Sequence, residues 1–378
     1  MFGKRSTFIS TLHIHTQVRT KDIVTYIEED EFFEGGSPTQ SPDLGESNPV
    51  NGTDTEEPFS RWVYSWGLDR LDDPAKLDRY FHSPCNLTGR GVDVYVLDTG
   101  IQYANSEFEG RALYSGCDII DEVGEEDRNG SDCNKHGTAV AATAGGLQHG
   151  VAPGSTLFSV RVLNCDKRTM ASVVVRGLEC MLDHHAQRPG RPAVVNMSLF
   201  GRKAKMIKRA IDRVIGSGVS VVTLSGNVVN PGTQNQTATQ TWLVRDSCKV
   251  TPGSIHGVIT VAGSTINNSA FESTKMGTCV DLFAPGKDVV TAAVAGTFCP
   301  RCQITFSGGS FAAPHVTGAI ALLLEKCPSI QPWRVKHLLL SKMTVANVLD
   351  MSTIRRRYRR TTPNLSLHLS SAMCNIEC

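Results

Sequence analysis

From residue 91 onward, short apolar runs rich in β-branched residues alternate with stretches of helical character, and this alternation constrains the fold most. A strand that is buried on both faces lacks polar alternation, as do these runs, which cover residues 92–97, 156–163, 193–197, 219–224 and 258–262. Helices are predicted at residues 170–185, 203–217 and 311–326. The sequence therefore predicts an α/β fold with a mainly parallel sheet and helices on both faces.

Length and composition fit one large globular domain from an oxidising compartment. The 378 residues are 40% hydrophobic, which suffices for a sizeable core. A formal net charge of +1 gives no reason to expect nucleic acid as a partner, and no run reaches the length of a membrane span. Twelve cysteines would be unusual in a cytosolic α/β enzyme. We expect a secreted or extracellular protein, and because residues 1–20 lack a signal-peptide core, an amino-terminal piece is expected to be missing.

Ser310 lies where a loop is predicted to turn into a buried helix. Gly308 and Gly309 precede it and lack a Cβ, so the backbone can turn tightly and approach a substrate closely. The first N–H groups of a helix have no intrahelical partner, and they favour negative charge that develops nearby. Ser310 is therefore a candidate nucleophile; an ordinary helix cap is the alternative.

Asp98 and His136 follow patterns that suit the same chemistry. Asp98 ends the first predicted strand, at the carboxyl edge where open parallel sheets gather ligand sites. His136 opens a run of small, helix-compatible residues. Each has an ordinary alternative, a turn cap for Asp98 and a surface histidine for His136. Together with Ser310 they supply carboxylate, base and nucleophile in the chain order Asp, His, Ser, which is one of the known orders of a catalytic triad.

Seven short motifs, spread over about residues 66 to 369, resemble those of the subtilases, which are subtilisin-type serine peptidases, and in particular the proteinase K-like branch. They are VLDTG at 96–100, HGT at 136–138, GVAP at 150–153, RVL at 161–163, NMSL at 196–199, SGN at 225–227 and SGGS at 307–310. The resemblance implies a subtilisin-like three-layer fold. It also implies that Asp98 orients His136, that His136 is the general base and that Ser310 is the nucleophile.

The resemblance extends to the oxyanion hole and the substrate cleft. Asn227 takes the position of the oxyanion-hole amide, although a turn residue after the strand at 219–224 is the alternative. The implied substrate-binding residues are Ser198, Leu199, Phe200, Ser225 and Gly226. Three of the family's usual residues are replaced: Gly309 stands where Thr is common, Phe200 where Gly is common, and Ala139 where His often follows His-Gly-Thr. We expect the phenyl group of Phe200 to narrow the cleft and restrict the peptides that bind.

Further motifs resemble a convertase of this family that cleaves its propeptide once, keeps it bound and then binds a lipoprotein receptor. They lie at residues 66–71, 161–165, 279–286 and 362–365. Two functions therefore remain. The first is a secreted serine endopeptidase that matures by autocatalytic cleavage, with its own propeptide and peptide or protein substrates as partners. The alternative is a self-cleaving, propeptide-inhibited protein that binds a cell-surface receptor of the lipoprotein type without turnover in trans.

The chain is predicted to have four parts. Residues 22–31 resemble the last strand of an inhibitory propeptide, so residues 1–32 are assigned to its carboxyl-terminal part. Residues 33–60 are rich in Gly, Ser, Pro, Asn and Glu and are predicted to be a flexible acidic linker, in which self-cleavage would fall before Trp62. Residues 61–371 form the catalytic domain, and residues 372–378 form a cysteine-containing tail.

The resemblance implies three disulfides, which are Cys133–Cys165, Cys248–Cys279 and Cys299–Cys302. The Cys-x-x-Cys at 299–302 also suits a redox or zinc site, but no second pair supplies matching ligands. The sequence leaves open the partners of the other six cysteines, which are Cys85, Cys117, Cys180, Cys327, Cys374 and Cys378. Of these, Cys374 and Cys378 are close enough in sequence to join each other or to link to another chain.

Three surface features complete the predictions. Glycosylation sequons occur at Asn51, Asn86, Asn129, Asn235, Asn267 and Asn364, whereas the sequon at Asn196 is expected to be buried and unused. The basic cluster at residues 355–360 reads first as a solvated surface loop, and otherwise as a cleavage site for a basic-specific convertase or a contact for an anionic glycan. The chemistry requires no cofactor, and the family allows structural calcium, but no dense carboxylate loop locates it.

Overall fold

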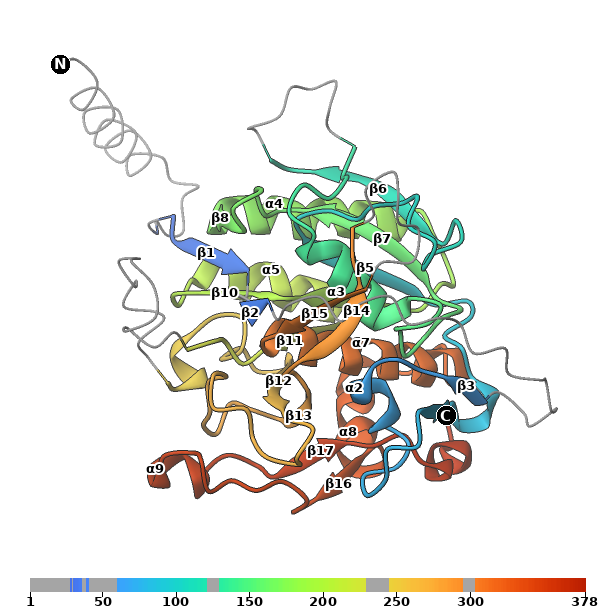
Figure 1. The fold of residues 1–378 in the computed structure, drawn as a ribbon. Helices are drawn as coiled ribbons and strands as arrows, with labels where there is room; N and C mark the ends of the chain where they lie inside the picture. Colours follow the sequence, from blue (N-terminus) through green and yellow to red (C-terminus); the bar gives the residue numbers. More distant parts are fainter. Residues whose placement is uncertain are drawn as a thin grey trace, which may run out of the picture.

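The computed structural model describes residues 28, 30–35, 39–40, 60–120, 129–228, 245–294 and 303–378. Its central sheet is parallel except where β16 and β17 pair antiparallel at one edge (Figure 1). The spatial order is β16 (Thr344–Ala346), β17 (Leu365–Leu367), β13 (Leu282–Pro285), β12 (Ile259–Ser264), β11 (Ser220–Leu224), β9 (Ala193–Met197), β5 (Asp93–Asp98), β7 (Thr156–Arg161) and β6 (Ala112–Asp118). All five apolar runs that were predicted as strands are strands of this sheet.

Helices cover both faces of the sheet, as the sequence predicts. Val94 and Val96 of β5 pack in one apolar cluster with α3 (His136–Gly145), α7 (Gly309–Lys326) and α8 (Pro332–Lys342). The alternate residues Tyr95 and Leu97 point to the other face and pack with α4 (Ala171–Ala186) and α5 (Lys205–Gly216). The three layers of a subtilisin-like α/β fold are therefore present.

The two helical layers differ in burial. In α5 the buried residues recur at the spacing of one helix face, being Ile207, Ala210, Ile211 and Val214, and the opposite face is solvated. In contrast, α7 is buried from Gly309 to Leu324 because it lies between the sheet and α3. A helix that is apolar all round is stable only in such an interior position.

A second sheet joins the amino-terminal segment to the domain. β1 (Phe32–Gly35) lies between β10 (Leu199–Gly201) and β8 (Arg168–Met170) and is antiparallel to both. β2 (Thr39–Gln40) pairs with β15 (Gln303–Ser307), which in turn pairs with β14 (Val289–Ala292). Residues 33–35 and 39–40, which were predicted to belong to a flexible linker, are therefore paired strands, and the predicted boundary after residue 32 cuts through β1.

The remaining elements are short. β3 (Ser60–Trp62) and β4 (Tyr80–His82) form a separate hairpin-like pair; the others are α2 (Trp66–Asp69), α9 (Arg356–Arg359), η1 (Pro84–Asn86), η3 (Ser247–Lys249) and η4 (Ser371–Asn375). α9 lies in the basic cluster that was first interpreted as a solvated surface loop. The arginines of the cluster are exposed, as that interpretation requires, but residues 356–359 form a helix and not a loop. None of the helices within the described ranges is long and apolar enough to cross a membrane.

Five disulfides join the described cysteines, and none of these cysteines is free. The predicted pairs Cys133–Cys165 and Cys248–Cys279 are confirmed, whereas Cys299 and Cys302 lie outside the described residues. The pairs that the sequence left open are Cys85–Cys374, Cys117–Cys180 and Cys327–Cys378. Cys374 and Cys378 do not join each other but fasten the carboxyl-terminal tail to two separate parts of the domain.

Candidate active site

Asp98 and His136 meet in a buried hydrogen bond. Asp98 is the last residue of β5 and His136 the first of α3, and both are almost wholly buried. Asp98 Oδ1 lies 2.7 Å from His136 Nδ1 and also accepts a hydrogen bond from the backbone N–H of Thr99 at 2.7 Å. With Nδ1 bound to a carboxylate, the imidazole keeps its Nδ1–H tautomer, and Nε2 is left as the acceptor.

Ser310 is the second residue of α7, in the first turn, as the sequence predicts. Pro314 lies four residues further on, inside the helix, and its missing N–H leaves the Ser310 carbonyl without an intrahelical donor. Ser198 Oγ supplies that donor at 2.9 Å, and Asn196 Nδ2 in turn donates to Ser198 Oγ at 3.0 Å. Ser198 therefore fixes the backbone of Ser310, a role that its prediction as a substrate-binding residue did not include.

Asn227 holds the start of the same helix. Its Oδ1 accepts the backbone N–H of Gly309 at 2.9 Å, so its Nδ2 is oriented away from that bond and toward the turn at Gly308. A Cβ on Gly309 would approach Asn227 Oδ1 to 3.2 Å and Leu224 Cβ to 3.1 Å. The glycine that replaces the family's usual threonine is therefore matched to a close approach of Asn227.

Four of these side chains have a buried polar atom without a hydrogen-bond partner among the described residues, namely Asp98 Oδ2, His136 Nε2, Ser310 Oγ and Asn227 Nδ2. The His136 ring meets the ring of Phe311, the residue after Ser310, edge to face at 5.7 Å. Because buried polar atoms are normally paired, a cluster of unpaired ones indicates a functional site. The structure thus brings together all four residues that were predicted from separate motifs.

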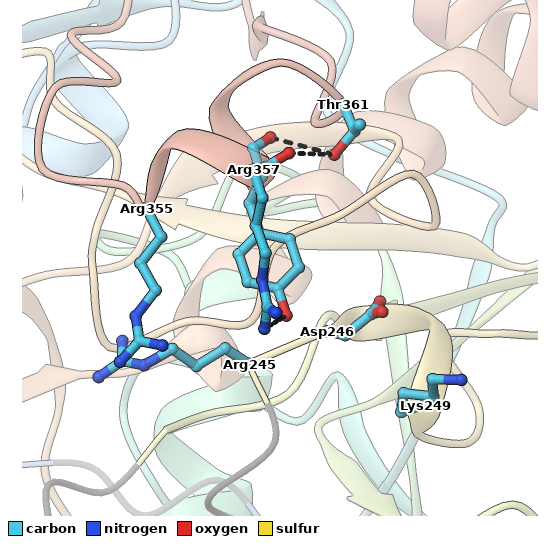
Figure 2. A pocket seen from close by; sticks show the side chains of 7 residues that line it. Arg245, Asp246, Lys249, Arg355, Arg357 and Thr361 are labelled. Carbon is cyan, nitrogen blue, oxygen red and sulfur yellow. Dashed lines mark hydrogen bonds between the residues drawn. The ribbon is translucent and has the colours of Figure 1, made fainter.

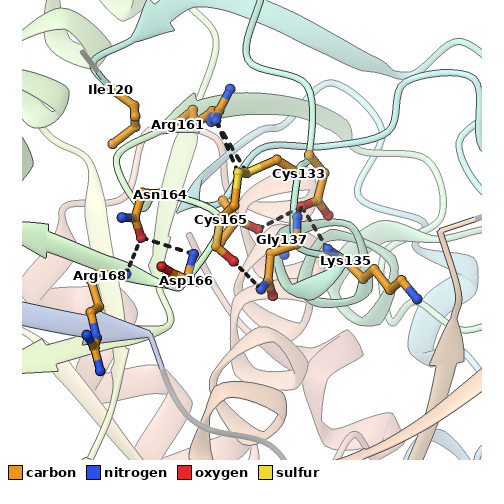
Figure 3. The surroundings of a disulfide bond; sticks show 12 residues. Ile120, Cys133, Lys135, Gly137, Arg161, Asn164, Cys165, Asp166 and Arg168 are labelled. Atoms are coloured by element: carbon orange, nitrogen blue, oxygen red, sulfur yellow. Dashed lines mark hydrogen bonds between the residues drawn. A yellow bond between two sulfur atoms is a disulfide. The ribbon is translucent and has the colours of Figure 1, made fainter. Parts of the chain in front are cut away.

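The disulfide Cys133–Cys165 ties the approach to α3 to the loop that leads into β8 (Figure 3). Asn134 Nδ2 donates to the Cys165 carbonyl at 2.6 Å across the same junction. Within the loop, Asn164 Oδ1 accepts the backbone N–H groups of Asp166 at 3.1 Å and Arg168 at 2.9 Å. The position of His136 is therefore linked covalently to β8, one of the two strands that flank β1.

β1 runs along the predicted substrate-binding strand. Gly35 is paired with Leu199, Glu34 with Phe200 and Phe33 with Gly201. On the other side, Gly35 N–H donates to the Lys167 carbonyl at 2.9 Å, just before β8. A Cβ on Gly35 would come within 2.9 Å of Leu163 Cδ1, so a larger residue there would have to displace the Leu163 side chain. The amino-terminal segment thus forms the middle strand of a three-stranded sheet beside Ser198.

Two carboxylates of the amino-terminal segment cap helices of the domain, which the sequence did not reveal. Glu28 Oε1 and Oε2 accept the backbone N–H groups of Lys205 at 2.6 Å and Met206 at 2.8 Å, at the start of α5. Asp30 Oδ1 accepts the backbone N–H of Ser172 at 2.8 Å, at the start of α4. Neither helix receives a cap from its own N-cap side chain.

Phe200 is buried and lies against a buried lysine. The Lys275 ammonium lies 5.5 Å from the centroid of the Phe200 ring. Burial, helped by the charge of Arg245, lowers the pKa of Lys275 to about 7. Lys275 N–H donates to the Gly226 carbonyl at 2.8 Å, and a Cβ on Gly226, whose φ is +97°, would lie 2.6 Å from Lys275 Cδ. Phe200 and Gly226 therefore both lie against Lys275, a residue that the motifs did not indicate. Ser225, the remaining predicted substrate-binding residue, is also buried.

The predicted glycosylation sites differ in exposure. Asn86, Asn129 and Asn267 are exposed, whereas Asn51 and Asn235 lie outside the described residues. Asn364 fits the prediction poorly because its Nδ2, the atom that would carry a glycan, donates to the Leu349 carbonyl at 2.9 Å. Within the described ranges, His, Cys, Asp and Glu form no group of three or more that could hold a metal ion, so calcium stays a prediction without a location.

Comparison with known proteins yields one family and several relatives. The model of the "Subtilase family" matches residues 89–362. The "Alkaline serine exoprotease A" of Vibrio alginolyticus is 33% identical over 96% of this chain, and the "Extracellular serine proteinase" of Thermus sp. (strain Rt41A) is 38% identical over 80%. The "Proprotein convertase subtilisin/kexin type 9" of Rattus norvegicus is 33% identical over 79%. These alignments span 58%, 66% and 41% of the relatives' own lengths, which is less than two thirds of each.

A solved structure described as a cold adapted subtilisin-like serine proteinase has the same fold. It superposes with a TM-score of 0.67 at 35% sequence identity, and the match covers 80% of this chain and 97% of that one. The matched family segment contains Asp98, His136, Asn227 and Ser310.

Proposed function

The chain belongs to the subtilase family, and from this premise we propose that it is a secreted serine endopeptidase that cleaves its own amino-terminal segment. Ser310 Oγ attacks the scissile carbonyl, and His136 Nε2 takes the proton and later passes it to the leaving amine. Asp98 holds the Nδ1–H tautomer and stabilises the imidazolium that forms. Asn227 Nδ2 donates to the oxyanion of the tetrahedral intermediate, together with a backbone N–H at the start of α7.

The observation that carries self-cleavage is the pairing of β1. An extended peptide that adds a strand to a sheet edge is bound by main-chain hydrogen bonds, so its register fixes which bond is presented. β1 ends at Gly35, opposite Leu199, and the residue before Leu199 is Ser198, whose hydroxyl is bonded to the Ser310 carbonyl. We therefore place the scissile bond between Gly35 and Thr39, near the amino-terminal end of the range that the sequence allowed.

A second function is favoured by the anchoring of the same segment. Glu28 and Asp30 hold α5 and α4 through backbone N–H groups, and both residues precede the proposed scissile bond. These contacts would survive cleavage, and β1 would then stay bound beside the active site as an inhibitor. In that case the protein acts as a binding partner of a cell-surface receptor of the lipoprotein type after a single turnover.

Expression of the full chain beside a Ser310→Ala variant tests the proposal. Mass spectrometry should find a new amino terminus between residues 36 and 39 in the natural chain, and an intact chain in the variant. A Ser341→Ala variant is the matched control because Ser341 is exposed on α8 and bonds only to the His337 carbonyl. Processing that persists in the Ser310→Ala variant would show that self-cleavage by Ser310 is wrong.

The purified protein then separates the two functions. Labelling by a fluorophosphonate probe and turnover of a peptide mixture, both lost in Ser310→Ala, would support an endopeptidase that acts in trans. A bound amino-terminal fragment with neither labelling nor turnover would support the receptor-binding protein instead.

A further inference from the structure

A pocket of about 630 Å³ lies between α9 and the segment at residues 245–249, and basic side chains dominate its lining (Figure 2). Arg355 and Arg357 come from the basic cluster, and Arg245 and Lys249 come from a segment more than a hundred residues earlier. Asp246 is the only acidic residue in the lining. The fold thus concentrates positive charge that is dispersed along a chain of net charge +1.

The α9 side of this pocket is fixed by packing. Tyr358 is buried in an apolar cluster with Phe283, and the Thr361 hydroxyl lies 3.2 Å from the Arg357 carbonyl and 3.3 Å from the Tyr358 carbonyl (Figure 2). The Arg357 guanidinium lies 4.4 Å from the centroid of the Tyr358 ring and donates to its hydroxyl at 2.5 Å. Arg357 is therefore held over an aromatic ring that is itself anchored.

Within the described part of the domain, Asp246 is the one carboxylate in the pocket lining beside four basic side chains. In the part of the chain that the structure describes, the side chains of Arg245, Lys249 and Arg355 have no ion pair or hydrogen bond. The Asp246 carboxylate is engaged by the backbone, because its Oδ1 accepts the N–H of Cys248 at 2.9 Å and so caps η3. In the view of Figure 2, Arg245 and Arg355 reach toward the same end of the pocket, and Lys249 lies toward the other.

We propose that this pocket binds sulfate ester groups of an extracellular sulfated polysaccharide. Guanidinium groups form paired, charge-assisted hydrogen bonds with tetrahedral oxyanions, and a pocket with three arginines and a lysine can meet more than one such group. The disulfides of the domain fit the compartment where such polysaccharides occur. Confinement of the charge to one concave site favours a few sulfate groups over the long phosphate track of a nucleic acid.

The structure disfavours the other reading of the basic cluster, as a cleavage site for a basic-specific protease. Proteases bind a substrate as an extended strand. Residues 356–359 form a helix, and Tyr358 in their midst is buried. Cleavage would require this helix to unfold and Tyr358 to leave its apolar cluster. Binding of an anion requires no such change, because the arginines already line the pocket.

The test is calorimetric titration of the full chain with a defined, fully sulfated heparin oligosaccharide. The double variant Arg245→Gln/Arg355→Gln should lose at least about tenfold in affinity, because it removes two charge-assisted contacts. The matched control is Arg356→Gln/Arg360→Gln, which also removes two positive charges, but from residues of the basic cluster that do not line the pocket. It should change affinity less than about twofold, since exposed charges outside the contact are screened.

Two further measurements complete the test. Asp246→Asn keeps an oxygen to cap η3 and removes the negative charge, so it should bind the oligosaccharide more tightly. Thermal melting and peptide turnover should be the same in all variants, because none of these residues touches the catalytic cluster. Equal losses in the two double variants, or binding of a DNA oligonucleotide as tight as that of the oligosaccharide, would overturn the proposal.

Discussion

The helices α3 and α7, which carry the candidate catalytic residues His136 and Ser310, and the helices α4 and α5 all begin without a cap from their own N-cap side chain. Their first backbone N–H groups are instead bound by acceptors from two different sources. At α3 and α7 the acceptors of the first backbone N–H groups come from the domain itself. They are the side chains of Thr99 and Asp132 for α3, and the side chain of Asn227 for α7. At α4 and α5, which begin beside the substrate edge, the acceptors are Asp30 and Glu28 of the amino-terminal segment.

This difference teaches that catalytic geometry and inhibition rest on separate interactions. The first backbone N–H groups of a helix are orphan donors, and carboxylates near them are stabilising. If the amino-terminal segment leaves, α4 and α5 lose their acceptors while α3 and α7 keep theirs. Loss of the segment should therefore leave the positions of Asp98, His136, Asn227 and Ser310 (the catalytic cluster) unchanged. It should destabilise the starts of α4 and α5, which lie beside β8 and β10 (the substrate edge). Four predictions test this contrast.

The largest effect is expected at Asp98. The Asp98→Asn variant keeps the shape of the side chain, but it no longer favours the Nδ1–H tautomer of His136. We expect kcat for peptide hydrolysis to fall by about 10⁴. Self-cleavage should slow in parallel, measured as the rate at which the new amino terminus appears after refolding. A variant that retains rapid self-cleavage would contradict the role of Asp98, and binding of the isolated amino-terminal segment should be unchanged.

Replacement of Asn227 separates its two contacts with α7. Both Asn227→Ala and Asn227→Asp remove the Nδ2 donor, and kcat should fall by roughly 10²–10³ in each. Only Asn227→Ala also removes the acceptor of the Gly309 N–H, so it alone should lose about 1 kcal/mol of unfolding free energy. Kinetics and thermal melting distinguish these losses. Full activity in Asn227→Asp would show that Nδ2 has no part in the reaction.

The third prediction concerns His315, a residue of α7, and the dependence of the unfolding free energy on pH. His315 is fully buried, its Nδ1 donates to the Phe311 carbonyl at 2.6 Å, and burial lowers its pKa to about 4. Between pH 6.5 and about 4 the unfolded chain then binds the extra proton, so the unfolding free energy falls as the pH falls through this window. The loss contributed by His315 approaches on the order of 3 kcal/mol near pH 4, at about 1.4 kcal/mol per pKa unit.

Chemical denaturation from pH 4 to 7 measures this contribution. His315→Gln should flatten the pH dependence of the unfolding free energy, whereas His337→Gln, an exposed histidine on α8, should leave it unchanged. An equally steep dependence in His315→Gln would assign acid sensitivity to other groups.

The fold that the sequence predicted is confirmed, and the candidate catalytic residues that it indicated come together in the structure, because both depend on local patterns. Runs of β-branched residues specify buried strands wherever they occur, and the motifs around Asp98, His136 and Ser310 each carry their own turn or helix start. The structure brought these motifs together by the register of a parallel sheet, whose carboxyl edge gathers loops from distant parts of the chain.

What the sequence did not reveal depends on long-range pairing. Asp30 caps a helix 142 residues away and Glu28 one 177 residues away, and no local capping pattern signals such a contact. The composition of residues 33–60 indicated a linker, since strands that form by pairing with another edge need little apolar content of their own. Lys275 carried no motif, and its place beside Phe200 follows only from the packing of its loop against β10.

The smallest effect is expected at Glu28 and Asp30, and it decides whether the substrate edge really differs from the catalytic cluster. Replacing a helix-capping side chain by alanine costs about 1 kcal/mol, so Glu28→Ala/Asp30→Ala should weaken binding of the cleaved amino-terminal segment by roughly tenfold to thirtyfold. Glu31→Ala is the matched control, because among the described residues the Glu31 side chain makes only a long contact of 3.9 Å with Arg202. Dissociation of the segment after cleavage should be faster in the double variant alone, and peptide turnover should rise with it. An unchanged dissociation rate would mean that the pairing of β1 holds the segment by itself, and the contrast between the two pairs of helices would then have no consequence for inhibition.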